Sequence, residues 1–178
     1  MRYLTLIRKL NVGTENRISK EKLADIFVQT GCRNVLVYIN SGNVLFDSDE
    51  LAEALRSNIG DNLSSYFKNR MRLLVFSKDE YQTIVDGIPQ DWQNDQTQRT
   101  DVAFYFGQPN GNFTLESLPF DFDFVQVKIL ANAMAWNLQR TKLNASKLNR
   151  LISSDLYNDL TIRNINTVRT ISTLLTGP

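Results

Sequence analysis

The hydrophobic positions of residues 1–77 predict alternating strands and helices. Residues 2–8 alternate in polarity, as a half-buried strand does. Three further predicted strands, rich in β-branched and aromatic residues, are the runs 35–39, 44–46 and 71–76. Between them lie two predicted helices. One is capped by Ser19 and stops at Gly31, and the other is opened by Asp47 and Glu50, which resemble a capping box.

This order of elements, strand-helix-strand-strand-helix-strand, is typical of the ferredoxin-like unit. Its four strands are expected in the order 4-1-3-2, with every neighbouring pair antiparallel. Strands one and two therefore end at the same edge of the sheet. The polar segments that follow them are expected to lie side by side.

A second, less regular unit is predicted downstream. Ser77 and Glu80 form a capping box for a connecting helix, and a polar loop spans 90–99. The predicted strands of this unit are 102–106, 122–130, 133–138 and 160–162. Its predicted helices are a short turn near 113–118, a helix capped by Asn144 and a last helix along Val168, Ile171 and Leu175.

We therefore predict an α+β protein of two tandem ferredoxin-like (βαββαβ) units with antiparallel sheets. The predicted domains are residues 1–77 for the first unit, 78–99 for the connecting helix and loop, and 100–178 for the second unit with its C-terminal helix. An apolar content of 42% over 178 residues is enough for a full globular core.

Composition excludes several kinds of active site. The chain has no histidine and one cysteine, Cys32, so disulfides, Cys/His zinc sites and Ser-His-Asp or Cys-His nucleophile systems are excluded. Cys32 follows Gly31 before an apolar run, and we expect a buried or half-buried structural thiol. An enzyme built from this chain would use Asp, Glu, Lys, Arg or Tyr for proton transfer. No metal and no cofactor is predicted.

We expect a cytoplasmic protein that does not interact with a membrane. The apolar stretch at the N-terminus is broken at Arg8, too early for a signal-peptide core of roughly 7–15 residues. No segment approaches the ~20 apolar residues that cross a bilayer.

Charge is unevenly distributed although the net charge is only +1. Residues 1–77 hold 11 basic and 8 acidic side chains (+3), 78–123 hold 2 and 9 (−7), and 124–178 hold 7 and 2 (+5), which sum to +1. The small net charge disfavours non-specific nucleic-acid binding. Three polar segments, 8–13, 40–43 and 161–167, lie in the two basic regions.

The first two of these segments have the side chains of an anion site. Arg8 offers a fork of donors suited to carboxylate or phosphate, and Gly13 and Gly42 allow backbone amides to approach a ligand. Further donors and acceptors come from Asn11, Asn40, Ser41 and Asn43. The alternative is that Ser41-Gly42 is only a turn and that the asparagines bond the local backbone.

The third segment lies where a strand becomes a helix. Arg163 is placed beside backbone amides at the positive end of that helix, and Lys147 is a second candidate cation. The structural alternative is that Asn164 or Asn166 caps the helix. Trp92 and Trp136 are assigned to packing.

Three functions follow from these observations. The leading hypothesis is a binding protein, or an enzyme, for a small anionic ligand such as a phosphorylated metabolite or nucleotide. Its candidate residues are Arg8, Asn11, Gly13, Asn40, Ser41, Gly42, Asn43, Lys147, Arg163 and Asn164. The second is an interaction module in which the polar segments tie the two halves together. The third is a weak single-stranded nucleic-acid binder that uses Phe104, Tyr105 and Phe106. The oligomeric state is not predicted.

The chain also resembles a bacterial family of uncharacterised proteins, domain of unknown function 1697. The resemblance is carried by 8–13, by 38–44, by Ser146-Lys147-Leu148 and by 161–168. It implies tandem ferredoxin-like units in a cytoplasmic protein, and it supplies no activity or catalytic residues. The chain departs from the family pattern at Lys9 and Thr14, which replace glycines, and at Asn40, Ile162 and Ile165.

Overall fold

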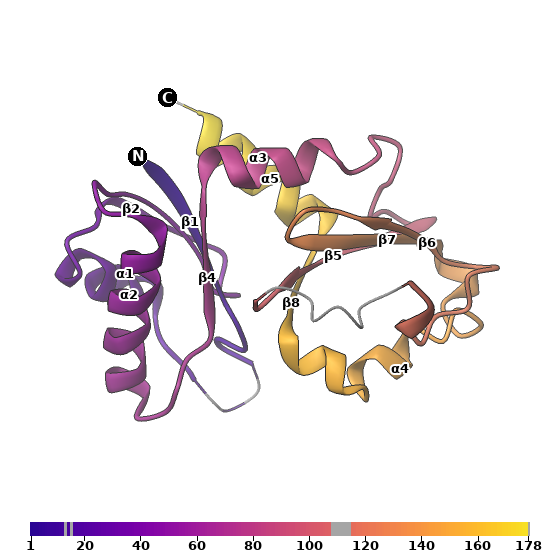
Figure 1. The fold of residues 1–178 in the computed structure, drawn as a ribbon, viewed down its shortest axis with the longest axis horizontal. Coiled ribbons are helices and arrows are strands. Elements are labelled where there is room, and N and C mark those ends of the chain that lie inside the picture. Colours follow the sequence, from indigo (N-terminus) through magenta and orange to yellow (C-terminus); the bar gives the residue numbers. More distant parts are fainter. Residues whose placement is uncertain (13, 15, 108–114, 178) are drawn as a thin grey trace. The chain divides into compact units, whose positions relative to one another are not determined.

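The computed structural model describes residues 1–12, 14, 16–107 and 115–177. Two compact units divide the chain (Figure 1). Unit 1 comprises Met1–Gln82 and Ile171–Pro178, and unit 2 comprises Thr83–Thr170. Each unit contains a four-stranded antiparallel sheet with helices, so the predicted α+β architecture of two tandem ferredoxin-like units is confirmed.

The sheet of unit 1 has the predicted strand order. Its strands are β1 (Arg2–Ile7), β2 (Arg33–Tyr38), β3 (Asn43–Asp47) and β4 (Leu73–Ser77). They are arranged β2-β3-β1-β4, and every neighbouring pair is antiparallel. In the register of the central strand, Leu4 pairs with Leu45 on β3 and with Phe76 on β4.

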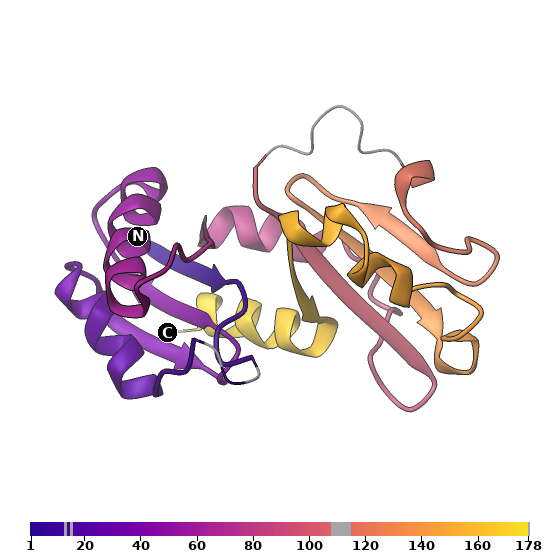
Figure 2. The ribbon, with the colours of Figure 1, turned by 90° about the horizontal axis from the view of Figure 1, so that it is seen from below.

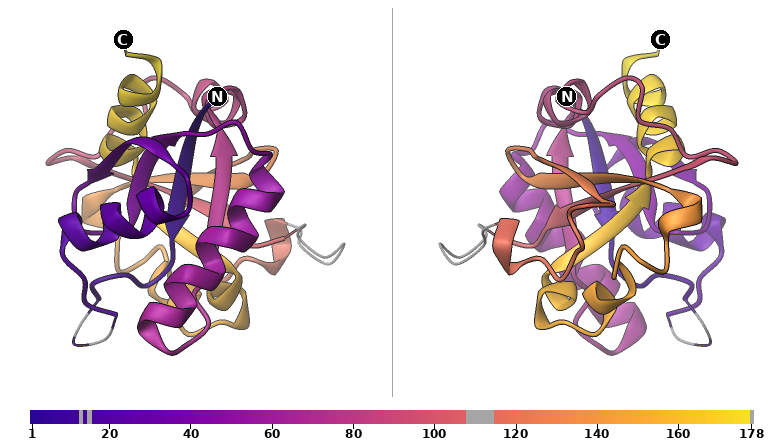
Figure 3. Two further views of the ribbon diagram at one scale, coloured as in Figure 1. Left: turned by 90° about the vertical axis from the view of Figure 1, so that its left-hand side faces the viewer. Right: turned by 90° about the vertical axis from the view of Figure 1, so that its right-hand side faces the viewer.

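Helices α1 (Lys20–Gln29) and α2 (Ala52–Phe67) cover one face of this sheet (Figures 1 and 3). They bury a core in which Phe27, Phe46 and Leu63 are fully enclosed.

Of the two helix caps predicted in unit 1, one forms and the other does not. Ser19 accepts a hydrogen bond from the Lys22 amide, as predicted. The capping box expected from Asp47 and Glu50 does not form, because α2 begins after Leu51, which makes no side-chain cap.

Helix α3 (Lys78–Asp86) begins with the predicted capping box: the Glu80 carboxylate accepts from the Ser77 amide at 2.8 Å, and Ser77 Oγ accepts from the Glu80 amide at 3.3 Å. The last helix is α5 (Ile165–Thr176). Its C-terminal part belongs to unit 1, where Ser172 Oγ donates to Gln82 Oε1 at 2.6 Å.

The sheet of unit 2 repeats the strand order of unit 1. Its strands are β5 (Gln98–Tyr105), β6 (Gln126–Ile129), β7 (Ala133–Gln139) and β8 (Leu160–Asn164). They are arranged β6-β7-β5-β8, all antiparallel. The segment that carries α4 (Asn149–Ile152) lies over one face of this sheet (Figure 2) and buries Leu148 and Leu151 against Trp136 and its neighbours.

The two helical segments predicted in the middle of unit 2 are short in the structure. The helix predicted after Asn144 is wrong in length. Lys147 has φ +57°, which interrupts helical geometry, and only the four-residue α4 and the short 3₁₀ turn η3 (Asp155–Asp159) follow it. Another 3₁₀ turn, η2 (Arg140–Lys142), precedes Asn144. The turn predicted near 113–118 is observed as η1 (Leu115–Ser117), and its first two predicted residues lie outside the described residues.

Candidate functional site

The first two polar segments meet in unit 1, as the strand order predicted. The Asn11 side chain links them: its Nδ2 donates to Asn40 O at 3.0 Å and to Ile18 O at 3.2 Å. Its Oδ1 accepts from the Ile18 amide at 2.8 Å. The described hydrogen bonds of this side chain are therefore all made to the protein's own backbone.

Gly42 allows the hairpin turn to lie close to the end of β1. It has φ +76°, and a Cβ there would lie 2.9 Å from Ile7 O and 3.2 Å from Leu10 Cβ. The Ile7 amide donates to Gly42 O at 2.7 Å. Glycine is required here because both the dihedral angle and the space exclude a side chain.

Asn43 and Ser41 stabilise the hairpin itself. Asn43 is fully buried, and its Nδ2 donates to Tyr38 O at 3.2 Å and to Ser41 Oγ at 3.0 Å. Arg8 is partly buried, and its backbone amide donates to Arg72 O at 2.9 Å. The remaining candidate of this segment, Gly13, lies outside the described residues.

A shallow hollow of about 600 Å³ opens beside these segments, and we call it the unit 1 hollow. It is lined by Asn11, Arg17, Ile18, Ser19, Lys22, Asn40 and Tyr66. Two cations and no carboxylate are among these residues. Neither Arg17 nor Lys22 was a predicted site residue, although both follow the first polar segment closely in sequence.

The remaining candidates belong to unit 2. The Lys147 ammonium lies 2.9 Å from Asp121 Oδ2. Through this hydrogen bond, and through its charge, it holds the pKa of Asp121 below the ordinary value. Arg163 is 8% exposed, and its Nη1 donates to Thr161 Oγ1 and to Ile162 O, both at 2.9 Å.

Asn164 caps α5, which was the structural alternative predicted for it. Its Oδ1 accepts from the Thr167 amide at 2.9 Å. The structure therefore divides the predicted site residues between two units and gives Asn11, Asn43, Lys147 and Asn164 structural partners within their own units. Their role in ligand binding remains a prediction.

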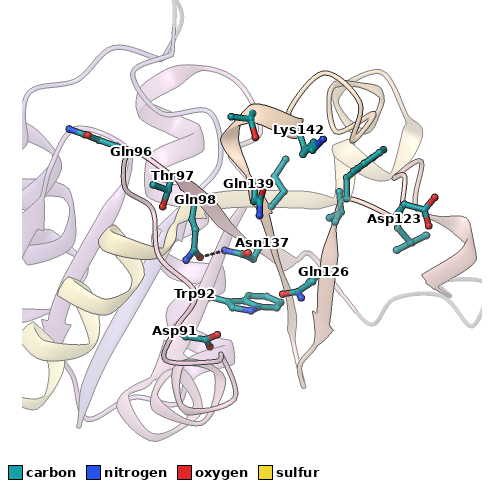
Figure 4. A pocket seen from close by; sticks show the side chains of 15 residues that line it. Asp91, Trp92, Gln96, Thr97, Gln98, Asp123, Gln126, Asn137, Gln139 and Lys142 are labelled. Atoms are coloured by element: carbon teal, nitrogen blue, oxygen red, sulfur yellow. Dashed lines mark hydrogen bonds between the residues drawn. The ribbon is translucent and has the colours of Figure 1, made fainter.

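A larger hollow, not predicted from the sequence, lies in unit 2 (Figure 4). We call it the unit 2 hollow, and its volume is about 900 Å³. It opens where β5 and β6 begin and β7 ends. Five amide side chains line it: Gln96, Gln98, Gln126, Asn137 and Gln139.

Aromatic side chains form part of its wall. Trp92 is 7% exposed, and Figure 4 shows the indole beside Gln126. Phe122 and Phe124 line the same hollow. The Lys142 ammonium lies 5.4 Å from the centroid of the Phe124 ring, within the range of a cation–π interaction.

The charged groups of the unit 2 hollow are two carboxylates, Asp91 and Asp123, and one ammonium, Lys142. The net charge of these three side chains is −1, which disfavours an anionic ligand.

Two backbone amides anchor the loop that leads to β5: Asp95 Oδ1 accepts from Thr97 N at 2.7 Å and from Gln98 N at 2.8 Å. These bonds lower the pKa of Asp95 and keep it ionised.

The sequence contains a signal for this hollow in the pairing of its amide residues across the strands. Gln98 pairs with Gln139 across β5 and β7, and Gln126 pairs with Asn137 across β6 and β7. Amide side chains thus gather at the same end of three neighbouring strands. The signal depends on strand register, which periodicity alone does not supply.

The fold and these hollows define an α+β protein of two tandem ferredoxin-like units, with a polar, aromatic-walled cavity in the second unit. The chain belongs to the family described as Protein of unknown function (DUF1697), whose sequence model matches residues 1–132. This confirms the family resemblance found in the polar segments.

A solved structure of the conserved bacterial protein SP0830 from Streptococcus pneumoniae is similar along nearly the whole chain. The similarity covers 98% of each chain, with a TM-score of 0.86 and 23% sequence identity, and it shows a shared fold. A search of curated proteins found no match.

Within the described part of the chain, no helix is long and apolar enough to cross a membrane. The same residues contain no group of three or more His, Cys, Asp or Glu side chains that could hold a metal ion.

Proposed function

We propose that this protein binds a small molecule in the unit 2 hollow. The observation that supports this most strongly is the composition of that hollow. A cavity of about 900 Å³ joins the aromatic wall of Trp92, Phe122 and Phe124 to five amide side chains. Ligand sites in proteins commonly combine a volume of ~300–1,000 Å³ with apolar walls and a few polar groups.

The ligand of this hollow is neutral rather than anionic. Asp91 and Asp123 outnumber Lys142 among the charged residues that line it. A phosphate group would be repelled by this balance. The proposal therefore keeps the small-ligand function expected from the sequence and changes both the place and the charge of the ligand.

Trp92 fluorescence tests the proposal. The chain has two tryptophans, and Trp136 is buried in the core of unit 2. In a Trp136→Phe variant, Trp92 becomes the sole indole reporter. We expect a saturable fluorescence change when neutral nucleosides, amides or sugars are titrated in.

The matched control is Trp92→Phe, which keeps Trp136 as the reporter on the buried side of the sheet. Its fluorescence should stay constant over the same titrations. If none of the three neutral classes changes the Trp92 signal, the unit 2 hollow is not a ligand site.

The anionic ligand expected from the sequence is a second candidate, at the unit 1 hollow. The observation that favours it is that Arg17 and Lys22 line the same hollow as the amides of Asn11 and Asn40, with no carboxylate among the described lining residues. The net charge of +3 over residues 1–77 adds to the local positive potential.

Pyrophosphate is the probe for this second site. The double variant Arg17→Gln, Lys22→Gln should weaken pyrophosphate binding at least about tenfold by calorimetry, since two charge-assisted contacts are removed. The control is Arg56→Gln, an exposed cation of α2 outside the hollow, which should bind pyrophosphate as the parent does. Equal binding by the double variant and the parent would remove this candidate.

The other two functions receive different support. The internal hydrogen bonds of Asn11 and Asn43 give the first two polar segments a structural role within unit 1. They do not join the two halves, so the interaction-module alternative, in which the segments tie the halves together, stays a prediction. Burial of Phe104 and Tyr105 counts against stacking of nucleic-acid bases on that strand.

We further propose a cytoplasmic location, as the family resemblance implies. We also propose an origin by internal duplication, which the equal strand orders of the two sheets support.

A further inference from the structure

Four amide side chains of the unit 2 hollow are spread over one face of three neighbouring strands. Gln98 on β5 lies opposite Gln139 on β7. On the next pair of strands, Gln126 of β6 lies opposite Asn137 of β7. Because every second residue of a strand shares a face, these four side chains lie on the same side of the sheet (Figure 4). Neighbouring amides are therefore roughly 5 Å apart across the strands and about 7 Å apart along β7.

The inner members of this group are held in place, and the outer members are open to solvent. Asn137 Nδ2 donates to Gln98 Oε1 at 2.7 Å and to Thr100 Oγ1 at 2.8 Å. Gln126 and Gln139 are exposed, and their side chains make no hydrogen bond to other residues that the structure describes. A ligand can therefore bond to these two amides without breaking a hydrogen bond inside the protein.

The carboxylates of the hollow add acceptors to these amides. Asp91 and Asp123 are exposed, and a carboxylate only accepts hydrogen bonds. A neutral ligand that contacts them must therefore supply donors. An amide side chain can both donate and accept, so the lining as a whole calls for a ligand with several donors and several acceptors.

Phe122 is the most exposed of the three aromatic rings in the lining. It is 46% exposed, whereas Trp92 is 7% exposed. Its ring meets the buried Phe120 ring edge-to-face, with centroids 6.4 Å apart, which positions it. The Phe124 ring already has the Lys142 ammonium over it. The apolar surface that a ligand can cover is therefore chiefly that of Phe122.

We infer that the unit 2 hollow binds a neutral sugar. Each sugar hydroxyl both donates and accepts, and the hydroxyls surround the ring, as amides spread over three strands require. A nucleobase or a simple amide has its hydrogen-bonding groups on one edge and would leave most of the lining without a partner. The C–H face of a sugar ring is apolar and packs on an aromatic ring such as Phe122.

The inference rests on the proposed function of the same hollow, and it adds the chemical class of the ligand. The net charge of −1 among the lining side chains disfavours sugar phosphates and sugar acids. The expected ligand is therefore an uncharged glycoside.

Methyl glycosides of glucose, galactose, mannose and ribose are the probes, and uridine and acetamide are the comparison ligands. With Trp92 as the sole indole, in the Trp136→Phe background, at least one glycoside should give a saturable fluorescence change. Acetamide should give none. Saturation-transfer NMR of the glycoside protons on the unsubstituted protein makes the same measurement if Trp136→Phe does not fold.

The amides are tested by the double variant Gln126→Met, Gln139→Met. Methionine keeps the length of the side chain and removes its amide, so glycoside affinity should fall at least about tenfold as two hydrogen bonds are lost. The matched control is Gln90→Met, an exposed glutamine of unit 2 outside the hollow. It should change glycoside affinity less than about twofold.

The aromatic contact is tested by Phe122→Ala, which should weaken glycoside binding about fivefold or more. The control is Ile129→Ala. Ile129 is 45% exposed in the same unit and does not line the hollow, so its removal should leave the affinity unchanged. Melting curves of all the variants report whether the fold is retained.

The outcomes separate the inference from the function on which it rests. If uridine or acetamide binds and no glycoside does, the sugar is wrong and the hollow remains a ligand site. If no probe binds, both fail. A glycoside that binds the Gln126, Gln139 and Phe122 variants as tightly as the controls lies elsewhere, which also overturns the inference. Weaker binding by these variants alone supports it.

Discussion

Single side chains explain why the polar segments of unit 1 have their particular residues. Asn11 bridges the loop that contains Ile18 and the hairpin turn at Asn40, with bonds of 2.8–3.2 Å. Gly42 lets the hairpin approach the end of β1, where its backbone oxygen accepts from Ile7. These residue types are what tight backbone packing requires, whether or not a ligand also binds nearby.

Replacing Gly42 tests this explanation. Gly42→Ala should lower the free energy of unfolding by about 2 kcal/mol or more, because an alanine at φ +76° is strained and its Cβ would meet Ile7 O at 2.9 Å. Urea denaturation measures the loss.

The matched control is Gly31→Ala. Gly31 has φ +85° but no heavy atom within 4 Å of its Cβ position, so only the conformational strain of about 1 kcal/mol is expected. An equal loss at both glycines would show that the close approach at Gly42 is unimportant.

Local signals predicted individual residues well where the partner is near in sequence. Ser19 and Asn164 cap their helices by accepting from amides three positions later. Cys32 is buried as expected, and burial raises the pKa of its thiol to about 11. The partners of Lys147 and Asn137 lie in other elements, so no local rule could identify the Asp121 ion pair or the Gln98 hydrogen bond.

Helix termini differ between α3 and α2. The first has a complete capping box at Ser77 and Glu80, whereas α2 begins after Leu51, whose side chain is 77% exposed and makes no cap. Leu51 has φ −74° and ψ 149°, the extended geometry that an N-cap residue adopts. A better residue could therefore be accommodated there without a backbone change.

Leu51→Ser should raise the free energy of unfolding by about 0.5–1 kcal/mol, since the hydroxyl can accept from an amide of the first turn. Thermal and urea denaturation measure the gain. Leu51→Ala, which removes the same exposed surface but offers no acceptor, should give no such gain. A stability increase of the same size in both variants would assign the effect to surface hydrophobicity instead of capping.

The predicted elements were confirmed most completely in unit 1, where strand order and both helices agree with the hydrophobic pattern. The helix predicted after Asn144 was wrong because apolar positions 148, 151 and 152 also suit a series of short turns. The left-handed backbone conformation of Lys147 favours the short turns over one long helix. Lysine seldom adopts this conformation, so the sequence gives no indication of it at this position.

The titration behaviour of the whole chain follows from its composition. Without histidine, no side chain has an ordinary pKa between about 5 and 8. The free energy of unfolding should therefore change by less than about 0.5 kcal/mol between about pH 5.5 and pH 7. Urea denaturation at constant ionic strength measures this, and a steady slope above about 1 kcal/mol over that interval would contradict it.

Stability should fall in acid. The pKa values of Asp95 and Asp121 are lowered in the folded protein, the first by backbone amides and the second by Lys147. Groups with lowered folded pKa values contribute stability above their unfolded pKa, and this contribution is lost as the pH falls through the folded value. The decline should therefore begin below about pH 4. Asp121→Asn removes one of these two carboxylates, so the free energy of unfolding of this variant should fall less steeply in acid.

The sequence by itself determined the two ferredoxin-like units, their strand order and the caps at Ser19, Ser77 and Asn164, because periodicity and capping act over a few residues. Only the tertiary structure decided that Asn11 and Lys147 have partners within the protein, and that Gln98 and Asn137 face one cavity. Those facts depend on strand register and on contacts between distant positions. The hydrophobic pattern and the capping residues of a short segment carry no information about strand register or about contacts between distant positions.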